Sequence, residues 1–211
     1  MKTDDLINVL SADLRPRIDI SRNIVLAAGA GAVVAAVLFF SVLGLRPDVG
    51  SAIDSVRFVF KFLPTLALTC AAFGLVISIV HPGRVQRGWQ FLLLVPVVLL
   101  AAAVVVELSV VPSSLWEQRM IGSNAVHCLT VIPLLSIIPG TCILMAMRHG
   151  APEKPGPAGA AAALVSAGIA ATLYATNCPD DSPLFVATWY PIATLLVAGV
   201  GYLAGMRFLR W

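Results

Sequence analysis

Six long apolar blocks constrain this chain more than any other feature of its sequence. Each is close to the roughly 20 residues that an α-helix needs to cross the hydrocarbon core of a bilayer. The blocks are Asn23–Leu45, Phe60–Val80, Phe91–Val111, Ala125–Met147, Ala158–Thr176 and Val186–Met206. Hydrophobic residues make up 59% of the chain and charged residues only 12%, unlike an ordinary soluble domain. The sequence therefore predicts an all-α integral membrane protein with six transmembrane helices.

The distribution of Lys and Arg among the connections predicts the orientation of these spans. Six spans place both termini on the same side of the membrane. Of the 14 Lys and Arg residues, most lie in the termini and in the second and fourth connections, which share one side of the membrane. Four lie on the opposite side. The four are Arg46, Arg57, Lys61 and Arg119. Because cytoplasmic segments are enriched in Lys and Arg, we expect both termini in the cytoplasm. The basic residues lie at block ends rather than in a patch, so no direct contact with nucleic acid is expected.

The first 22 residues, Met1–Arg22, are the largest part of the chain that is not membrane-like. Leu6, Leu10 and Leu14 recur every four residues in this segment, which predicts a short amphipathic helix. Pro16 is expected to end that helix near Leu14. A helix of about 12 residues is marginal in isolation, so it needs a surface on which to pack.

Two surfaces are compatible with this leucine stripe. One is the bilayer itself, although interfacial helices usually carry a Lys- and Arg-rich polar face, whereas this one is acidic. The other is a groove on a cytoplasmic protein. On the second interpretation, residues 1–22 form a partner-binding segment and residues 23–211 a transmembrane domain. The first apolar block is too long for a cleaved signal peptide, and we expect it to remain as a span.

Glu107 is the only acidic residue inside a predicted span. An intramembrane carboxylate often belongs to an ion or proton pathway. Glu107, however, lies one turn from the outer end of its span, where it can reach the interface or pair with Arg119. The sequence offers no second buried charge for a relay. A small six-span transporter or channel therefore remains an alternative to a binding function rather than the preferred prediction.

Two of the four cysteines are expected at the outer side of the membrane. Cys128 falls in the first outer turn of the fourth span, and Cys178 in the loop between the fifth and sixth spans. They are compatible with a structural disulfide, with a redox- or metal-sensing thiol pair, or with two unrelated residues. A helix N-terminus favours the thiolate of Cys128, whereas neighbouring aspartates disfavour it at Cys178. Cys70 and Cys142 lie deeper and are expected to be buried apolar side chains.

A metal ion is a further candidate ligand of the outer cysteines. His127, Cys128, Cys178 and Asp180 would offer a transient soft metal a mixed set of ligands. The sequence contains no CxxC or HxxH spacing, so these ligands would have to converge from two segments. It also contains no P-loop, HExxH or Ser/His/Asp arrangement, and we expect neither a permanent cofactor nor an enzyme. A membrane thiol oxidoreductase is the enzymatic alternative, and it would usually require a CxxC pair.

Two motifs give the chain a family resemblance. They are TDDLINVLSADLRP at the start and NCPDDSPLFVATWYP before the sixth span. Together with six spans and a cysteine at the outer start of the fourth, they resemble the NrsF-type negative regulators of extracytoplasmic-function sigma factors. The resemblance covers essentially the whole chain. It implies a polytopic anti-sigma factor that holds such a sigma factor at the bacterial inner membrane until an envelope stress signal arrives.

The resemblance also implies roles for individual residues. The residues that it assigns to the sigma-binding segment are Leu6, Ile7, Leu10, Asp13 and Pro16, and the leucine stripe adds Leu14. Cys128 and Cys178 stand where the family carries its paired outer cysteines. The resulting hypothesis is that the stripe occupies a groove on the sigma factor. Oxidation or metal capture at the two cysteines would then repack spans four to six and weaken that hold.

Overall fold

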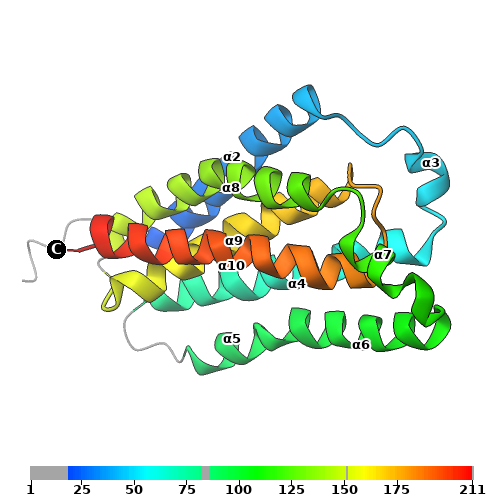
Figure 1. Cartoon of the computed structure of the whole chain (residues 1–211). Helices are drawn as coiled ribbons and strands as arrows, with labels where there is room; N and C mark the ends of the chain where they lie inside the picture. The colour runs from blue at the N-terminus through cyan, green and yellow to red at the C-terminus, as the bar shows by residue number, and fades with distance from the viewer. Residues whose placement is uncertain (1–18, 82–85, 151, 211) are drawn as a thin grey trace, which may run out of the picture.

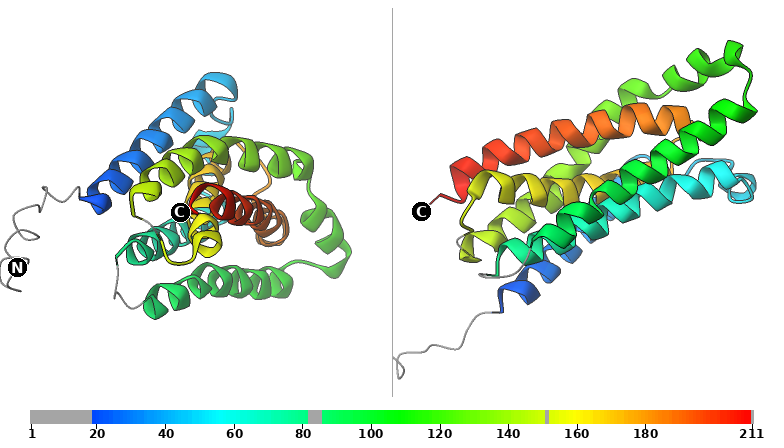
Figure 2. Two further views of the ribbon diagram at one scale, coloured as in Figure 1. Left: turned by 90° about the vertical axis from the view of Figure 1, so that its left-hand side faces the viewer. Right: turned by 90° about the horizontal axis from the view of Figure 1, so that it is seen from below.

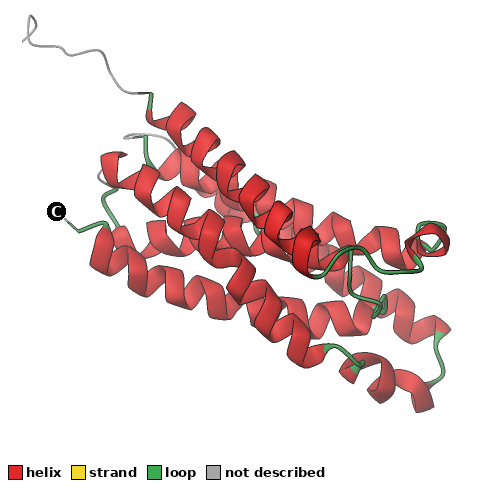
Figure 3. Ribbon diagram, turned by 90° about the horizontal axis from the view of Figure 1, so that it is seen from above, coloured by secondary structure: helices red, strands yellow, loops and turns green. Residues whose placement is uncertain are grey.

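The computed structural model describes residues 19–81, 86–150 and 152–210. The described residues form helices joined by loops, with no β-strand among them (Figure 3). The α-helices are α2 (Ile20–Val42), α3 (Val49–Ala52), α4 (Val56–Ile79), α5 (Arg87–Leu92), α6 (Leu94–Val110), α7 (Trp116–Ile121), α8 (Ala125–Met147), α9 (Pro155–Ala175) and α10 (Pro183–Phe208). Two short 3₁₀ helices, η1 (Ser113–Leu115) and η2 (Arg148–Gly150), adjoin α7 and α8.

Within the described residues, six helical stretches are long and apolar enough to cross a membrane. They are Ile20–Val42, Val56–Ile79, Arg87–Val110, Ser113–Gly150, Pro155–Ala175 and Pro183–Phe208. The prediction of an all-α membrane protein with six spanning helices is therefore confirmed. The predicted bounds were least accurate where charged residues interrupt the apolar pattern. α4, for example, begins at Val56 rather than Phe60, so that Arg57 and Lys61 belong to the helix itself.

α9 is the most buried of the six spans and lies between α4, α8 and α10 (Figure 2). Its sequence is rich in Ala and Gly, which lets neighbouring backbones approach closely. A Cβ atom at Gly159 would clash with the backbone of Gly201 and Gly205 in α10. The close contact between α9 and α10 therefore depends on these glycines.

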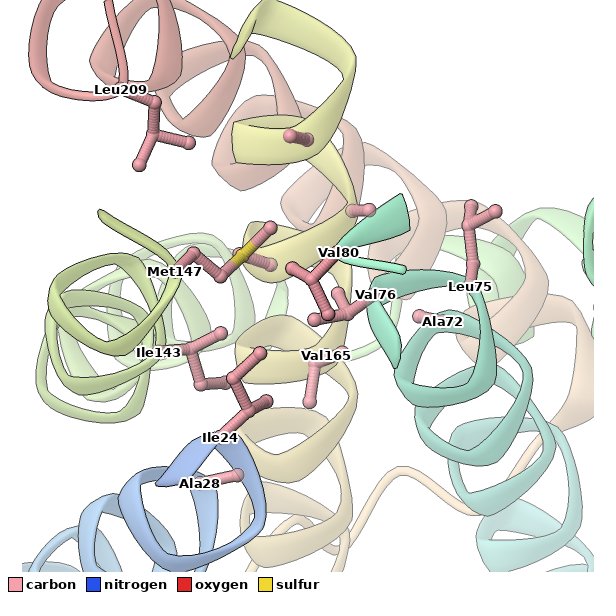
Figure 4. Packing of buried hydrophobic residues seen from close by; sticks show 13 residues of the cluster. Ile24, Ala28, Ala72, Leu75, Val76, Val80, Ile143, Met147, Val165 and Leu209 are labelled. Carbon is pink, nitrogen blue, oxygen red and sulfur yellow. The ribbon is translucent and has the colours of Figure 1, made fainter. Parts of the chain in front are cut away.

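α2 lies at the edge of the bundle, where it packs mainly on α8 and to a smaller extent on α9 (Figure 1). Ile24 and Ala28 in the first turns of α2 belong to the same buried cluster as Ile143 and Met147 of α8, and Figure 4 shows Ile24 beside Ile143. The same buried cluster includes Leu209, which follows α10. Both ends of the described chain thus lie at one end of the bundle, which we call the inner end in keeping with the predicted topology.

The deeper cysteines do not match the prediction that both are buried. Cys70 of α4 is exposed at the surface of the bundle, and Cys142 of α8 is only half-buried. The prediction was wrong because a membrane helix can turn an apolar side chain toward lipid as well as toward another helix. Hydrophobicity alone does not distinguish the two directions.

Candidate functional site

The loop between α9 and α10, residues 176–182, lies at the outer end of the bundle (Figure 1). We call it the Cys178 loop. Its backbone is held against the end of α9, since the amides of Asn177 and Cys178 both donate to the carbonyl of Tyr174, at 3.1 and 3.0 Å. At its other end the Ser182 hydroxyl accepts from the Leu184 amide at the start of α10. Both ends of the loop are therefore hydrogen-bonded to the helices that it connects.

Cys128 and Cys178 belong to a single buried cluster at the outer end. Their exposed fractions are 0% and 1%, and both thiols are free. The other buried members of this cluster are Phe39, Ile132, Ala170, Ala171, Tyr174, Phe185, Val186, Tyr190 and Ala193. The structure therefore places the two predicted outer cysteines in one cluster, in their reduced form. Because Cys128 has no exposed surface, a thiolate there would be buried, which opposes the benefit expected from its helix N-terminus.

Cys178 lies outside the spanning helices, and its environment acts on the thiol in two opposite ways. Burial raises the pKa of the Cys178 thiol, because a buried thiolate loses its hydration. The ammonium group of Lys61 lowers it, but to a smaller extent. Burial is thus the main cause that disfavours the thiolate, rather than the neighbouring aspartates named by the sequence analysis.

Asp181 forms the centre of a largely buried ion cluster beneath the loop. Its carboxylate accepts from Arg46 Nη1 at 3.0 Å and lies 2.6 Å from Lys61 Nζ. Lys61 is fully buried and also donates to the carbonyl oxygen of Cys178 at 2.8 Å. Both cations lie over the ring of Phe58, at 5.4 and 5.1 Å from its centroid. We call Arg46, Lys61 and Asp181 the Asp181 ion cluster.

Arg46 has a second carboxylate partner, which balances the charge of the cluster. Asp48 accepts from Arg46 Nε at 2.6 Å and from Nη2 at 2.7 Å. The hydrogen bonds and charge of Asp48 and Asp181 raise the pKa of the Arg46 guanidinium, and Arg46 in turn lowers the pKa of Asp48. Two cations thus face two carboxylates, the arrangement that makes buried charge tolerable.

The neighbouring aspartate, Asp180, caps the helix that carries Cys128. Its Oδ2 accepts from the backbone amides of Ser123 and Asn124 at 3.0 and 2.9 Å, and from the Asn124 side chain at 3.0 Å. A carboxylate at this position satisfies free amides and complements the helix dipole. Asp180 therefore ties the Cys178 loop to the start of α8.

The predicted metal ligands are not brought together. His127 is exposed, whereas Cys128 beside it is fully buried. The Asp180 carboxylate already accepts hydrogen bonds from the backbone amides that precede α8. Within residues 19–81, 86–150 and 152–210, no group of three or more His, Cys, Asp or Glu side chains is arranged to hold a metal ion. The geometry gives the metal hypothesis no support.

The Cys178 loop is also attached to the outer end of α2. Asn177 Nδ2 donates to the carbonyl oxygens of Leu43 and Gly44, at 3.2 Å each, directly after the last turn of that helix. Arg46 follows two residues later and pairs with Asp181. The loop thus contacts α2, α4 and α8 at their outer ends, in addition to α9 and α10, which it connects.

The contribution of Arg46, Lys61 and Asn177 was not predicted. The two basic residues were interpreted as signals of membrane topology, and Asn177 was not singled out. Lys61 nevertheless carried a detectable signal, because it lies at the start of an apolar block and a buried lysine requires a partner. Two aspartates in a short loop at the same side of the membrane were the obvious candidates.

A separate ion cluster surrounds Glu107, which is buried. Its carboxylate lies 2.7 Å from Arg119 Nη1 and 3.0 Å from Arg57 Nε. Of the two alternatives left by the sequence, reaching the interface or pairing with Arg119, the structure shows the pairing, and Arg57 is an additional partner. The carboxylate joins α4 and α6 to α7.

Comparison with known proteins identifies the family. The chain matches the family described as "Negative regulator of sigma F" (NrsF) over residues 10–211. It belongs to the NrsF family. It is 34% identical to the anti-sigma-F factor NrsF of Caulobacter vibrioides and 30% identical to the probable anti-sigma-F factor NrsF of Azospira oryzae. Both alignments cover the whole of each chain. No solved structure matches the fold.

Membership of the NrsF family confirms the resemblance based on the two sequence motifs. The predicted sigma-binding residues themselves, Leu6, Ile7, Leu10, Asp13, Leu14 and Pro16, lie outside the described residues. α2 begins shortly after them, at Ile20, with the Asp19 side chain accepting from the Arg22 amide at 3.2 Å. At the same inner end, Ser21 Oγ lies 3.2 Å from Nε2 of His81, which follows α4. The N-terminal segment therefore leads into a helix whose first turn contacts the end of α4.

Proposed function

We propose that this protein is a membrane-bound anti-sigma factor that sequesters an extracytoplasmic-function sigma factor at the bacterial inner membrane. The observation that carries the proposal is the relationship, over the whole chain, to two proteins named as anti-sigma-F factors. The six apolar helices supply the membrane anchor. Both termini are cytoplasmic in this proposal, in keeping with the distribution of Lys and Arg.

The sigma factor binds to the N-terminal segment, residues 1–22. Its leucine stripe offers one apolar helix face, which suits a hydrophobic groove on a soluble protein. Of the acidic residues in this segment, Asp13 contributes to binding, and Asp4 and Asp5 remain in solvent. Helix formation and binding would occur together, because so short a helix is marginal in isolation.

Release follows a redox signal at Cys128 and Cys178. The two thiols pass two protons and two electrons to a disulfide in the outer compartment, which is reduced to two thiols, and one disulfide bond forms between the sulfur atoms of Cys128 and Cys178. Their place in a single buried cluster supports a reaction between them. Metal capture is the less supported signal, since it requires His127 and Asp180 to leave their present positions.

The energetic requirement for release is modest. Each tenfold loss of affinity corresponds to about 1.4 kcal/mol. A shift from almost complete binding to almost complete release needs about 5.5 kcal/mol of differential stability between the two states. Disulfide formation between two side chains packed in a core changes the conformation of that core, and several kcal/mol of repacking energy is within reach.

A pull-down from detergent-solubilised membranes tests the binding function. The variant carries Leu6→Asp and Leu10→Asp on the apolar stripe. A matched control carries Asn8→Asp and Ser11→Asp, which add the same charge to the opposite face. We expect the wild type and the control to recover a sigma factor, identified by mass spectrometry, and the stripe variant to lose it. If the wild type recovers no sigma factor, the proposed function is wrong.

A second experiment tests the signal. Diamide, a diazene that takes up the two electrons and two protons released by a pair of thiols, is added to membranes that carry the complex. We expect it to release the sigma factor from the wild type and from a Cys70→Ser, Cys142→Ser control. The Cys128→Ser, Cys178→Ser variant should retain it. Equal release from all three proteins would contradict a sensing role for this pair.

A further inference from the structure

We propose that the Asp181 ion cluster couples the Cys178 loop to α2, and that α2 transmits the thiol signal across the membrane to the N-terminal segment. This inference rests on the proposed function, since it names the path by which the cysteines control sigma binding. It assigns Arg46, Lys61 and Asp181 a positioning role that no motif in the sequence indicated.

The Cys178 loop is attached to the outer end of α2 by an ion pair and by hydrogen bonds. Arg46 follows that helix by four residues and is paired with Asp181 through two contacts of 3.0 Å. Asn177 adds hydrogen bonds to the carbonyl oxygens of Leu43 and Gly44. All of these contacts join the outer end of α2 to a seven-residue loop that contains Cys178. A movement of this loop therefore acts directly on the end of α2.

Lys61 connects Cys178 to the Asp181 ion cluster. Lys61 Nζ binds both the backbone carbonyl of Cys178 and the carboxylate of Asp181. A displacement of the Cys178 backbone toward Cys128 would alter this contact, because the carbonyl of Cys178 is one of the two acceptors of Lys61. The ion cluster is thus intact when both thiols are reduced and buried, which we assign to the state that holds the sigma factor. Disulfide formation disturbs it.

The length and the position of α2 suit it to transmit a movement across the membrane. It has 23 residues and spans about 35 Å at the rise of an α-helix, enough to cross the hydrocarbon core. It lies at the edge of the bundle, so it can shift with less repacking than α9 (Figure 2). Its first residue, Ile20, lies four positions after Pro16, the last of the residues assigned to sigma binding. A shift of its outer end consequently reaches the site where the sigma factor binds.

The contact between α2 and α8 provides a way to move α2 without touching the cysteines. A Cβ atom at Gly31 would lie 2.6 Å from the Cα of Pro139, so an added methyl group must push the two helices apart. Gly29, in the same helix, has open space around it. Gly31→Ala and Gly29→Ala therefore form a matched pair that differs only in its effect on helix packing.

The experiment measures sigma factor retained on washed membranes, using the sigma factor recovered by the wild type. Arg46→Gln should lower retention at least threefold without any oxidant, while Arg46→Lys should restore most of it. Arg57→Gln, which alters an arginine of the Glu107 cluster at the same end, should leave retention unchanged. Gly31→Ala should lower retention, and Gly29→Ala should not.

The order of events provides a second readout. Arg46→Gln is combined with Cys128→Ser and Cys178→Ser, which by themselves block release by diamide. Because the ion cluster lies between the thiols and α2, we expect the triple variant to release the sigma factor in the absence of a signal. A merely structural role for Arg46 would lower retention only in step with the loss of folded protein, whereas the coupling role lowers retention in a variant that remains folded. Elution as a single species in size-exclusion chromatography establishes that each variant is folded.

The outcomes separate this inference from the proposed function. If the wild type retains no sigma factor, the proposed function fails. If the wild type retains the sigma factor and releases it on oxidation, but Arg46→Gln and Gly31→Ala behave as the wild type does, the coupling through α2 is wrong. If Arg46→Gln does not fold, the comparison of Gly31→Ala with Gly29→Ala decides whether α2 transmits the signal, because neither residue belongs to the ion cluster. Equal retention by these two variants would then overturn the inference.

Discussion

The Nζ atom of Lys61 donates a hydrogen bond of 2.8 Å to the backbone carbonyl of Cys178, although the two residues are 117 positions apart in the chain. The same ammonium group pairs with Asp181 at 2.6 Å. A single buried lysine thus fixes both the position of a predicted sensing cysteine and the carboxylate that contacts the end of α2. Its removal should affect the stability of the whole outer end.

Replacement of Lys61 by methionine is expected to destabilise the protein by about 3–5 kcal/mol. The methionine leaves the Asp181 carboxylate short of one partner and the Cys178 carbonyl without its donor, and breaking a buried pair costs this much. Thermal unfolding in detergent measures the loss. Arg207→Met, at the inner end of α10, is the control and should change stability by less than 1 kcal/mol.

A double-mutant cycle distinguishes the ion pair from the bulk of the side chain. Removal of both charges in Lys61→Met, Asp181→Leu should cost less than the sum of the two single substitutions, because no uncompensated charge remains. Additive costs would show that the two side chains contribute independently and would contradict the pairing.

Asp180→Ala is expected to destabilise the protein by roughly 0.5–2 kcal/mol, the usual cost of a lost helix cap. The carboxylate accepts from the amides of Ser123 and Asn124, and alanine cannot replace it. Chemical denaturation in detergent provides the measurement. Asp54→Ala, which removes an exposed carboxylate after α3, should have little effect. Equal effects of the two substitutions would exclude a capping role.

Much of the fold was predictable from the sequence because hydrocarbon thickness dictates the length of a span. Six blocks of suitable length gave six spanning helices. The pairing of Glu107 with Arg119 was predictable for a related reason, since a carboxylate inside a span requires a nearby cation. The length of an apolar block and the need to pair a charge inside a span were sufficient for these predictions.

The Asp181 ion cluster was not predictable in this way. It joins residues from the connection after α2, from α4 and from the loop before α10, and only the packing of these helices brings them together. The exposure of Cys70 was missed because a lipid-facing position and a helix-facing position have the same hydrophobicity. Burial of Cys128 was missed because its position on the helix indicated a dipole effect but not what covers the thiol.

Gly122→Ala should be more destabilising than Gly44→Ala. Both glycines have a positive φ, 60° and 69°, so each substitution introduces backbone strain, and Gly122 also has a ψ of −168°, a combination that is essentially restricted to glycine. A Cβ at Gly122 would in addition overlap the ring of Phe185 and approach the carboxylate of Asp180. A Cβ at Gly44 would have no atom other than those of its chain neighbours within 4 Å. The difference in unfolding free energy between the two variants reports the clash together with the additional backbone strain at Gly122. Equal losses would mean that Phe185 can move aside.

Modification of Cys178 by a maleimide should depend on pH in a way that reflects its burial. Burial raises the pKa of this thiol, so less of the reactive thiolate is present at a given pH than for a free cysteine. In a Cys70→Ser, Cys128→Ser, Cys142→Ser background, the reaction rate should continue to increase above pH 8.5, the value near which a free cysteine is half-ionised. Asp181→Asn should accelerate the reaction by loosening the loop. A rate that levels off at pH 8.5 in the folded protein would contradict the buried environment.

Replacement of Glu107 by glutamine tests whether the second ion cluster has a structural role alone. The carboxylate contacts Arg57 and Arg119, which are both partly exposed, so solvent weakens each pair. We expect a loss of about 1–3 kcal/mol in unfolding free energy, because a buried acceptor of two charged donors becomes neutral. Release of the sigma factor by diamide should be unchanged, since none of these three residues contacts the Cys178 loop through an ion pair. A variant that is stable but no longer responds to diamide would place Glu107 on the signalling path and would require a route through α4 and α6 in addition to α2.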